Sequence, residues 1–207
     1  MTIFSIIAPL RASTPNRKAV PLFPWICAVL LAAMAPAAHA FDIAELMRQL
    51  AGSTYSTARF TEHKYLHSLN KPLESNGILR YDAPDHFVKQ TLQPGMETMT
   101  IDGDTLTIER RGKSRTMQLQ DYPVLQAFIE CIRSTMRGDL AALRQYYDLE
   151  LSGEPQHWQI TLLPKDDNVK KAVQNIVISG AGSSITSIEI DQARGDRSVM
   201  NISRDSP

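Results

Sequence analysis

The stretch ARFTEHKYLHSLNKPLESNGILRYDAPDHFVKQTLQPGMETMTIDGDTLTI, residues 58–108, decides the fold class of this 207-residue chain. Its first segment alternates residues of opposite character from Ala58 to Tyr65, which is the period of a β-strand. Turn dipeptides such as Asn76-Gly77 and Asp102-Gly103 then separate further short runs rich in β-branched and aromatic residues. Strands joined so tightly pair antiparallel, because parallel strands need long crossover connections.

The same pattern continues beyond this stretch and predicts about eleven strands. They are expected at residues 53–68, 77–81, 87–92, 98–101, 105–109, 115–119, 149–151, 158–163, 172–179, 184–191 and 198–203. No repeat, linker or charge run divides them, so we expect a single, mainly β (α+β) domain built as a sandwich or as a curved, barrel-like sheet.

Helical periodicity occurs in three places. Residues 42–51 begin with Asp42 as a plausible N-cap, and Glu45 is expected to complete a capping box. Pro123–Arg137 carries a wide apolar stripe, and Asp139 is expected to cap a shorter helix that runs to Tyr147. The strands supply few large side chains, so these helices are the candidates to cover the concave face of the sheet. The pattern leaves open whether the space between them is a solid core or an apolar cavity.

The N-terminus has the features of a secretory signal. Basic residues between positions 11 and 18 precede an apolar run at 20–38, which ends in Ala38-His39-Ala40. Prolines interrupt the run, which disfavours the alternative of a transmembrane anchor. We therefore predict a cleaved signal peptide at residues 1–40 and a mature domain at 41–207. Cleavage would remove three of the 22 basic residues and none of the 22 acidic ones, which leaves a net charge of −3.

The sequence offers few candidates for catalytic, metal-binding or nucleic-acid-binding residues. The balanced charge excludes a nucleic-acid binder that depends on net positive charge, and no common nucleophile, metal or phosphate-binding motif is present. His63 and His67 are four apart, about 13 Å along a strand at ~3.3 Å per residue, too far to share a metal ion. Cys131 lies at the margin of an apolar helix face, where a buried, unreactive thiol is expected. We therefore predict no catalytic residue, metal or cofactor, and a binding or carrier module rather than an enzyme.

The order of motifs is more specific than any one of them. A Phe-Thr-Glu strand, a Gly-x-Leu strand, a turn with Pro84, a Phe strand and an Asp-Gly hairpin follow one another within residues 58–108. Residues 162–203 add a Leu-x-Pro-Lys strand end, a glycine hairpin and a final Asp-Arg-Ser strand. This sequence resembles the LolA family of periplasmic carriers of outer-membrane lipoproteins. It is more closely similar to the LolA-like proteins that accompany lipid-exporter and acyltransferase genes.

The resemblance implies an unclosed antiparallel β-barrel beneath a helical lid, with an apolar cavity for acyl chains between them. It implies a soluble periplasmic carrier, most simply a monomer, which ferries an acylated lipid or lipoprotein between the inner and outer membranes. An inner-membrane exporter would be the donor and an outer-membrane protein the acceptor, with no role for nucleic acid. The alternative is a non-catalytic periplasmic accessory or scaffold protein of a lipid-export system that binds protein partners.

Two departures from the family bear on cargo and opening. The lipoprotein carriers place an arginine that latches the lid just before the turn proline, where this chain has Ala83. They also continue past the last strand into a further loop and strand, whereas this sequence stops at Pro207. We therefore expect a lid that opens easily and a cargo that is a related lipid rather than a lipoprotein.

The candidate cargo-binding residues are apolar and face inward in the predicted strands and helices, although ordinary core packing is an alternative for each of them. For the wall they are Phe60, Leu79, Tyr81, Phe87, Met99, Ile101, Leu106, Ile108, Met117 and Leu119. For the lid they are Leu46, Leu50, Val124, Leu125, Phe128, Ile129, Ile132, Met136 and Leu143.

Overall fold

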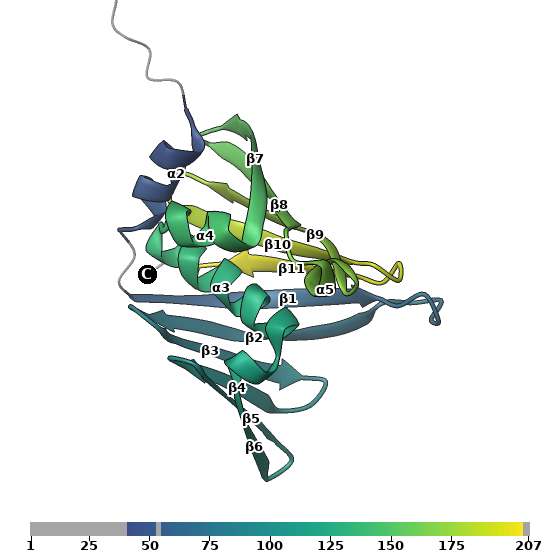
Figure 1. Cartoon of the computed structure of the whole chain (residues 1–207). Coiled ribbons are helices and arrows are strands. Elements are labelled where there is room, and N and C mark those ends of the chain that lie inside the picture. Colours follow the sequence, from purple (N-terminus) through teal and green to yellow (C-terminus); the bar gives the residue numbers. More distant parts are fainter. Residues whose placement is uncertain (1–40, 53–54, 205–207) are drawn as a thin grey trace, which may run out of the picture. The chain divides into compact units, whose positions relative to one another are not determined.

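The computed structural model describes residues 41–52 and 55–204 of the chain, so the predicted signal peptide at 1–40 lies outside the described residues. Within the described ranges, eleven strands form one antiparallel sheet with helices across one face (Figure 1). The strands are β1 (Tyr55–Tyr65), β2 (Leu73–Asp82), β3 (His86–Gln93), β4 (Glu97–Asp102), β5 (Thr105–Arg110), β6 (Lys113–Gln118), β7 (Tyr147–Glu154), β8 (His157–Pro164), β9 (Val173–Ala181), β10 (Ser184–Gln192) and β11 (Arg197–Ser203).

The sheet consists of two meanders joined through the first and last strands. Its order is β6-β5-β4-β3-β2-β1-β11-β10-β9-β8-β7, and β6 and β7 are its two edges. β1 pairs with β11 from Arg59↔Ser203 to Tyr65↔Arg197. The sheet does not close on itself, which confirms the predicted mainly β, unclosed antiparallel architecture.

The helices cover one face of the sheet, and the longest of them lies between the two meanders in the chain. They are α2 (Ile43–Leu50), the 3₁₀ helix η1 (Leu119–Asp121), α3 (Pro123–Arg137), α4 (Leu140–Tyr146) and the short α5 (Asp167–Lys170). Figure 1 shows α3 crossing the face of the sheet, with α4 beside it. The lid predicted from helical periodicity is therefore present, with α3 as its longest element.

Local signals fix where these helices begin and end. Asp42 caps α2 by accepting the backbone N–H of Glu45 at 2.8 Å, as predicted. The capping box is wrong in its second half, because the Glu45 carboxylate contacts Arg48 and Gln49 one turn further on instead. Gly138 ends α3 with a φ of 65°. A Cβ at this glycine would overlap the carbonyl oxygen of Met47, so the end of α3 packs directly against α2.

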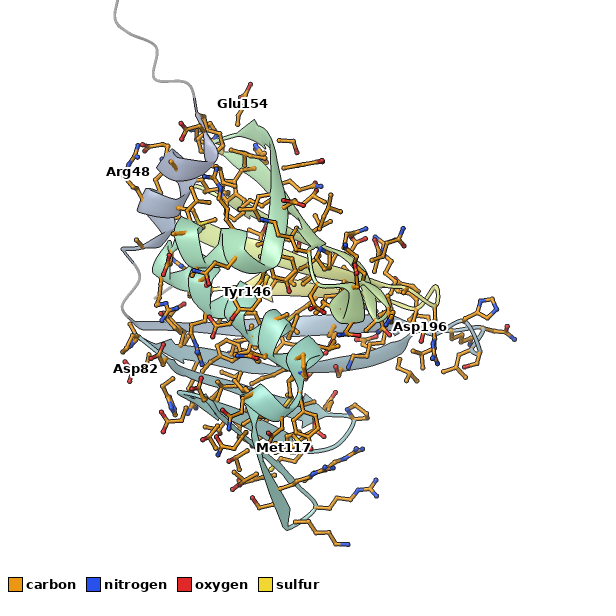
Figure 2. All side chains as sticks on the ribbon, in the orientation of Figure 1. Arg48, Asp82, Met117, Tyr146, Glu154 and Asp196 are labelled. Atoms are coloured by element: carbon orange, nitrogen blue, oxygen red, sulfur yellow. The ribbon has the colours of Figure 1, made fainter. Side chains whose placement is uncertain are left out.

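Two separate clusters make up the dense part of the interior. The larger joins α2, α3 and α4 to strands β7–β9, and its largest members are Trp158 and Tyr147. The smaller cluster consists of Ile101, Leu106, Leu119 and Ile129, and lies where β4–β6 meet the start of α3. Figure 2 marks Met117 in this region, at the end of the sheet opposite to Glu154.

Two elements differ from the sequence-based expectation. Leu119 is the first residue of η1 rather than the end of a strand, and its side chain is fully buried in the smaller cluster. The sequence predicts no helix between the strands at 158–163 and 172–179, but Asp166 caps α5 there by accepting the N–H groups of Asn168 and Val169. A single turn of helix buries one apolar side chain, Val169, so it has no periodicity that a sequence could display.

The largest buried side chain depends on a glycine. The Trp158 indole lies against Gly180 of the neighbouring strand, and its Nε1–H donates to the carbonyl oxygen of Gly182 at 2.8 Å. A Cβ at Gly180 would overlap both the indole and the carbonyl oxygen of Ser184. The indole therefore occupies the space that any other residue at position 180 would need for its side chain.

We predict that Gly180→Ala destabilises the domain by about 1–3 kcal/mol, because the new methyl group overpacks the core around Trp158. Chemical denaturation of the two proteins measures this difference. Gly95→Ala is the matched control, since a Cβ at Gly95 meets nothing within 4 Å. Equal losses of stability in the two variants would contradict the packing account.

Candidate functional site: an apolar cavity beneath the helices

A cavity of about 320 Å³ lies between α3 and the inner face of the sheet. Strands β1–β4 form one side of it and β9–β11 form the other, so both meanders contribute. Its volume is near the lower end of the range of about 300–1,000 Å³ found for pockets that hold small ligands. The interior therefore contains an apolar cavity as well as two solid cores, which resolves the alternative that the sequence pattern left open.

The cavity brings together many of the apolar residues that the sequence singled out. From the predicted wall it is lined by Leu79, Tyr81, Phe87, Met99 and Ile101. From the predicted lid it is lined by Leu50, Phe128, Ile129, Ile132 and Met136. These residues come from β2–β4, α2 and α3, and they lie on the faces of those elements that border the cavity.

Other predicted residues do not line the cavity. Leu106, Ile108, Met117, Leu119 and Leu125 belong to the smaller core or pack against it, because β5 and β6 press directly on the start of α3. Leu46 and Leu143 belong to the larger core. Phe60 is buried, and its ring lies beneath the Lys89 ammonium group and against Gly77. Val124 is half-buried outside the lining.

The opposite wall of the cavity was missed by sequence reasoning. It is built from aliphatic residues of the second meander, namely Ile176, Ile178, Ile185, Ile188, Ile190, Met200 and Ile202. Alternation such as Ile176-x-Ile178 and Ile188-x-Ile190 was the available signal. A register shift in β10 between Ile185 and Ser187 brings Ile185 and Ile188 to the same face, which strict alternation would not predict.

A cluster of polar side chains borders the cavity around Glu62 of β1. The Glu62 side chain is buried, with 5% of its surface exposed, and its Oε2 accepts a hydrogen bond from Lys89 Nζ at 2.6 Å. Ser198 of β11 donates to Oε1 at 2.8 Å. Burial alone would raise the pKa of Glu62, but the Lys89 ammonium group and the other donors hold it below its ordinary value. Glu62 is therefore an ionised carboxylate inside a largely apolar cavity.

This cluster lies toward one end of β1. Lys64, two residues beyond Glu62, is opposite Ser198, which follows closely after Asp196 in the chain. At the other end Tyr55 pairs with Asp82. Figure 2 labels Asp82 and Asp196 at opposite ends of the long central strands. The Glu62 cluster thus lies on the side of Asp196, and the apolar lining of the cavity continues beneath α3.

Reactive groups are not assembled here. Cys131 lines the cavity, but its side chain is almost fully buried, and burial raises the pKa of its thiol to about 12, which keeps it protonated. Among residues 41–52 and 55–204, no group of His, Cys, Asp and Glu could hold a metal ion. None of the described helices is long and apolar enough to cross a membrane.

The lid is tied to the sheet by arginines of α3. Arg137 Nη1 donates to Asp85 Oδ1 at 3.0 Å, and Arg133 Nε lies 3.6 Å from the same oxygen. Arg133 also donates to the carbonyl oxygen of Gly103 in the β4–β5 turn. Glu130 completes the network by accepting from Arg133 Nη1 at 2.7 Å. Two turns of the sheet are thus joined to the second half of α3.

These contacts bear on the expectation, based on Ala83, of a lid that opens easily. Ala83 does lack the arginine that latches the lid in lipoprotein carriers, but the same turn is held from the other partner, through Asp85 and the lid arginines. The two ion pairs join residues that are 48 and 52 positions apart in the chain, so no local sequence pattern predicts them. The presence of an acidic residue directly after Pro84 was the only available hint.

Comparisons with solved structures find chains that are similar to this one at low identity. Solved structures that resemble this chain include a LolA superfamily protein from Nitrosomonas europaea, with 12% identity, a TM-score of 0.43 and coverage of 80% of this chain and 93% of that one. The Pseudomonas aeruginosa MucA/MucB complex matches with 14% identity, a TM-score of 0.43 and coverage of 81% and 59%. Lipoprotein LppX of Mycobacterium tuberculosis matches with 13% identity, a TM-score of 0.37 and coverage of 80% and 96%.

No curated protein sequence matches the chain. The structural likenesses are low in identity and TM-score, so no argument about this chain rests on them. A family model covers far more of the chain than any single motif does. It is described as "Outer membrane lipoprotein carrier protein LolA-like" and matches residues 35–203, so this chain belongs to the LolA-like family.

Proposed function

We propose that this protein is a periplasmic carrier that holds an acyl chain of a lipid or lipoprotein in its cavity and ferries it between membranes. The observation that supports this proposal best is the cavity itself, which is walled by aliphatic side chains from both meanders and roofed by α3. Family membership supports the same function. The predicted signal peptide supports the periplasm as its location.

The physical need for such a carrier is large. Each CH₂ group of an acyl chain costs about 0.8 kcal/mol to expose to water, so a long chain does not cross an aqueous compartment unshielded. The wall must attract the chain without fixing it, because the cargo must also be released. Isoleucine, leucine and methionine meet this need, since their contacts are non-directional and methionine adapts its shape. Met99, Met136 and Met200 all line the cavity.

The size of the cavity favours a small cargo. At about 320 Å³ it suits one acyl chain better than the several chains of a mature lipoprotein. A larger cargo would require α3 to move away from the sheet. We therefore place a single-chain lipid ahead of a lipoprotein, in line with the sequence-based expectation about cargo.

The rest of the proposal follows from this role. The protein acts without catalysis and without a cofactor, as a monomer. It receives cargo from an inner-membrane exporter and delivers it to an outer-membrane acceptor. Delivery requires the ion pairs between α3 and the two turns of the sheet to open, so the latch through Asp85 is the proposed control point.

Native mass spectrometry of the mature protein, purified from its own periplasm, is the direct test. We expect an additional mass that extracts into organic solvent as an acylated molecule. A protein that stays free of lipid when fatty acids or lysophospholipids are offered would contradict the carrier proposal. That result would favour the alternative of an accessory protein that binds protein partners.

We predict that Ile132→Asp lowers the affinity for an acyl ligand by about tenfold or more, because it places a carboxylate in the apolar lining. Titration with a fluorescent fatty acid measures the affinity. Val124→Asp is the matched control, since it makes the same change on the same helix outside the cavity. A folded Ile132→Asp protein that binds as tightly as the control would remove α3 from the binding site.

We predict that Asp85→Ala loosens the lid, because Arg133 and Arg137 both lose their partner in the β2–β3 turn. Asp85 is partly exposed, so solvent screening reduces the expected effect to about 1 kcal/mol. Amide hydrogen exchange across Pro123–Arg137 should become about fivefold faster. Asp104→Ala is the control, because Asp104 is 78% exposed and its carboxylate lies 3.9 Å from Arg133. Equal exchange in the two variants would show that Asp85 does not hold the lid.

A further inference from the structure

The buried carboxylate of Glu62 forms ion pairs with two lysines at once. Lys89 Nζ lies 2.6 Å from its Oε2, and Lys64 Nζ lies 3.4 Å from its Oε1. Ser198 and Ser75 donate to the same two oxygens, at 2.8 and 3.4 Å. Both carboxylate oxygens are therefore fully engaged, whereas each ammonium group has three donors and makes one contact with the carboxylate. The donors in this cluster outnumber its acceptors.

The charge of the cluster is also unbalanced. Two ammonium groups and one carboxylate leave a net charge of +1. Among the described residues that line the cavity, Glu62 is the one acidic residue, whereas Lys64 and Lys89 of the cluster are basic; Arg80 and Arg204 also border the cavity but are exposed. Glu62 already carries its full negative charge, since its pKa lies below the ordinary value. The cavity therefore cannot neutralise the excess from its own lining.

The position of Lys89 makes the excess charge available to a ligand. Its side chain is 18% exposed and lines the cavity, and its ammonium group lies 4.9 Å from the centre of the Phe60 ring. The ring and the carboxylate hold the ammonium group in place from the strand side. Lys64 is 49% exposed at the same end of the cavity and can reach a ligand or water. An ammonium group held in an apolar, low-dielectric cavity interacts strongly with any anion placed beside it.

We propose that Lys89 and Lys64, positioned by Glu62, bind the anionic head of a single-chain lipid whose acyl chain occupies the apolar part of the cavity. The head is a carboxylate or a phosphate, which the two ammonium groups contact by charge-assisted hydrogen bonds. This inference rests on the proposed carrier function and adds to it a cargo class and an orientation, with the head at the end of the cavity near Asp196.

A purely structural ion pair predicts different behaviour from a head-group site. If Glu62 and Lys89 serve only to join β1 to β3, removing either charge weakens the fold and leaves ligand preference unchanged. If they form a head-group site, Glu62→Gln raises the charge of the cluster from +1 to +2 and strengthens anion binding. Lys64→Met lowers the charge to zero and weakens it. The two substitutions therefore shift ligand preference in opposite directions.

The experiment compares three ligands with the same chain, namely dodecanoate, dodecyl phosphate and dodecanol, by calorimetric titration of the mature protein. We expect the wild type to bind the better of the two anions about tenfold more tightly than dodecanol. Lys64→Met should abolish this preference and Glu62→Gln should increase it, while the affinity for dodecanol stays the same. Lys113→Met is the control, because Lys113 is exposed at the start of β6, away from the cavity. The ratio between dodecanoate and dodecyl phosphate identifies the head group.

The outcomes separate the two proposals. Equal affinity for all three ligands, unchanged in the variants, would overturn the head-group site and leave the carrier function standing. If none of the ligands binds, both proposals fail together. Lys64 is half exposed, so Lys64→Met should fold normally and carries the test even if Glu62→Gln is unstable. Thermal unfolding of each variant establishes that the proteins compared are folded.

Discussion

The pairing of β1 with β11 is the constraint on which the rest of the structure depends. It joins the first strand of the domain to the last, from Arg59↔Ser203 to Tyr65↔Arg197, and so makes one sheet of two meanders. The cavity takes one wall from each meander, and the Glu62–Ser198 hydrogen bond crosses the same seam. Neither the cavity nor the Glu62 cluster exists until residues more than a hundred positions apart have met. Such long-range pairing is slow to form, because the chain loses the entropy of closing the loop before the stabilising contacts have formed.

The hollow interior is maintained by the solid regions on either side of it. The cluster around Trp158 and the cluster around Leu106 pack the two ends of the helical layer firmly against the sheet. α3 spans the distance between them and cannot sink further onto the strands. An empty hole of 320 Å³ would cost about 8 kcal/mol at about 24 cal/mol per Å³, as much as the net stability of many domains. A space of this size is therefore tolerable only when water or a ligand fills it.

The sequence was sufficient for the strands and the longer helices, and for the faces of several of them. Period-2 alternation, turn dipeptides and the stripe of Pro123–Arg137 are local, and local patterns predicted the strands, the lid and half of the cavity wall. They could not distinguish Leu106, which is buried in the smaller core, from Ile101, which also borders the cavity. Alternation shows which face of a strand points inward, but it does not show whether that face meets a packed core or a cavity. Contacts between distant residues, such as Arg137 with Asp85, depend on the final packing and leave no local trace.

One consequence follows from the way the lid is attached. The helical insert begins directly after β6 and ends where β7 starts, and these are the two edges of the sheet. Among the described residues each edge strand has a neighbour on one side only. Bending the sheet changes the distance between these two edges, and so between the ends of the insert, without breaking the ladder hydrogen bonds between neighbouring strands. The width of the cavity can therefore change when the sheet bends and no strands separate. Ligands of different size then fit at little cost in backbone hydrogen bonds.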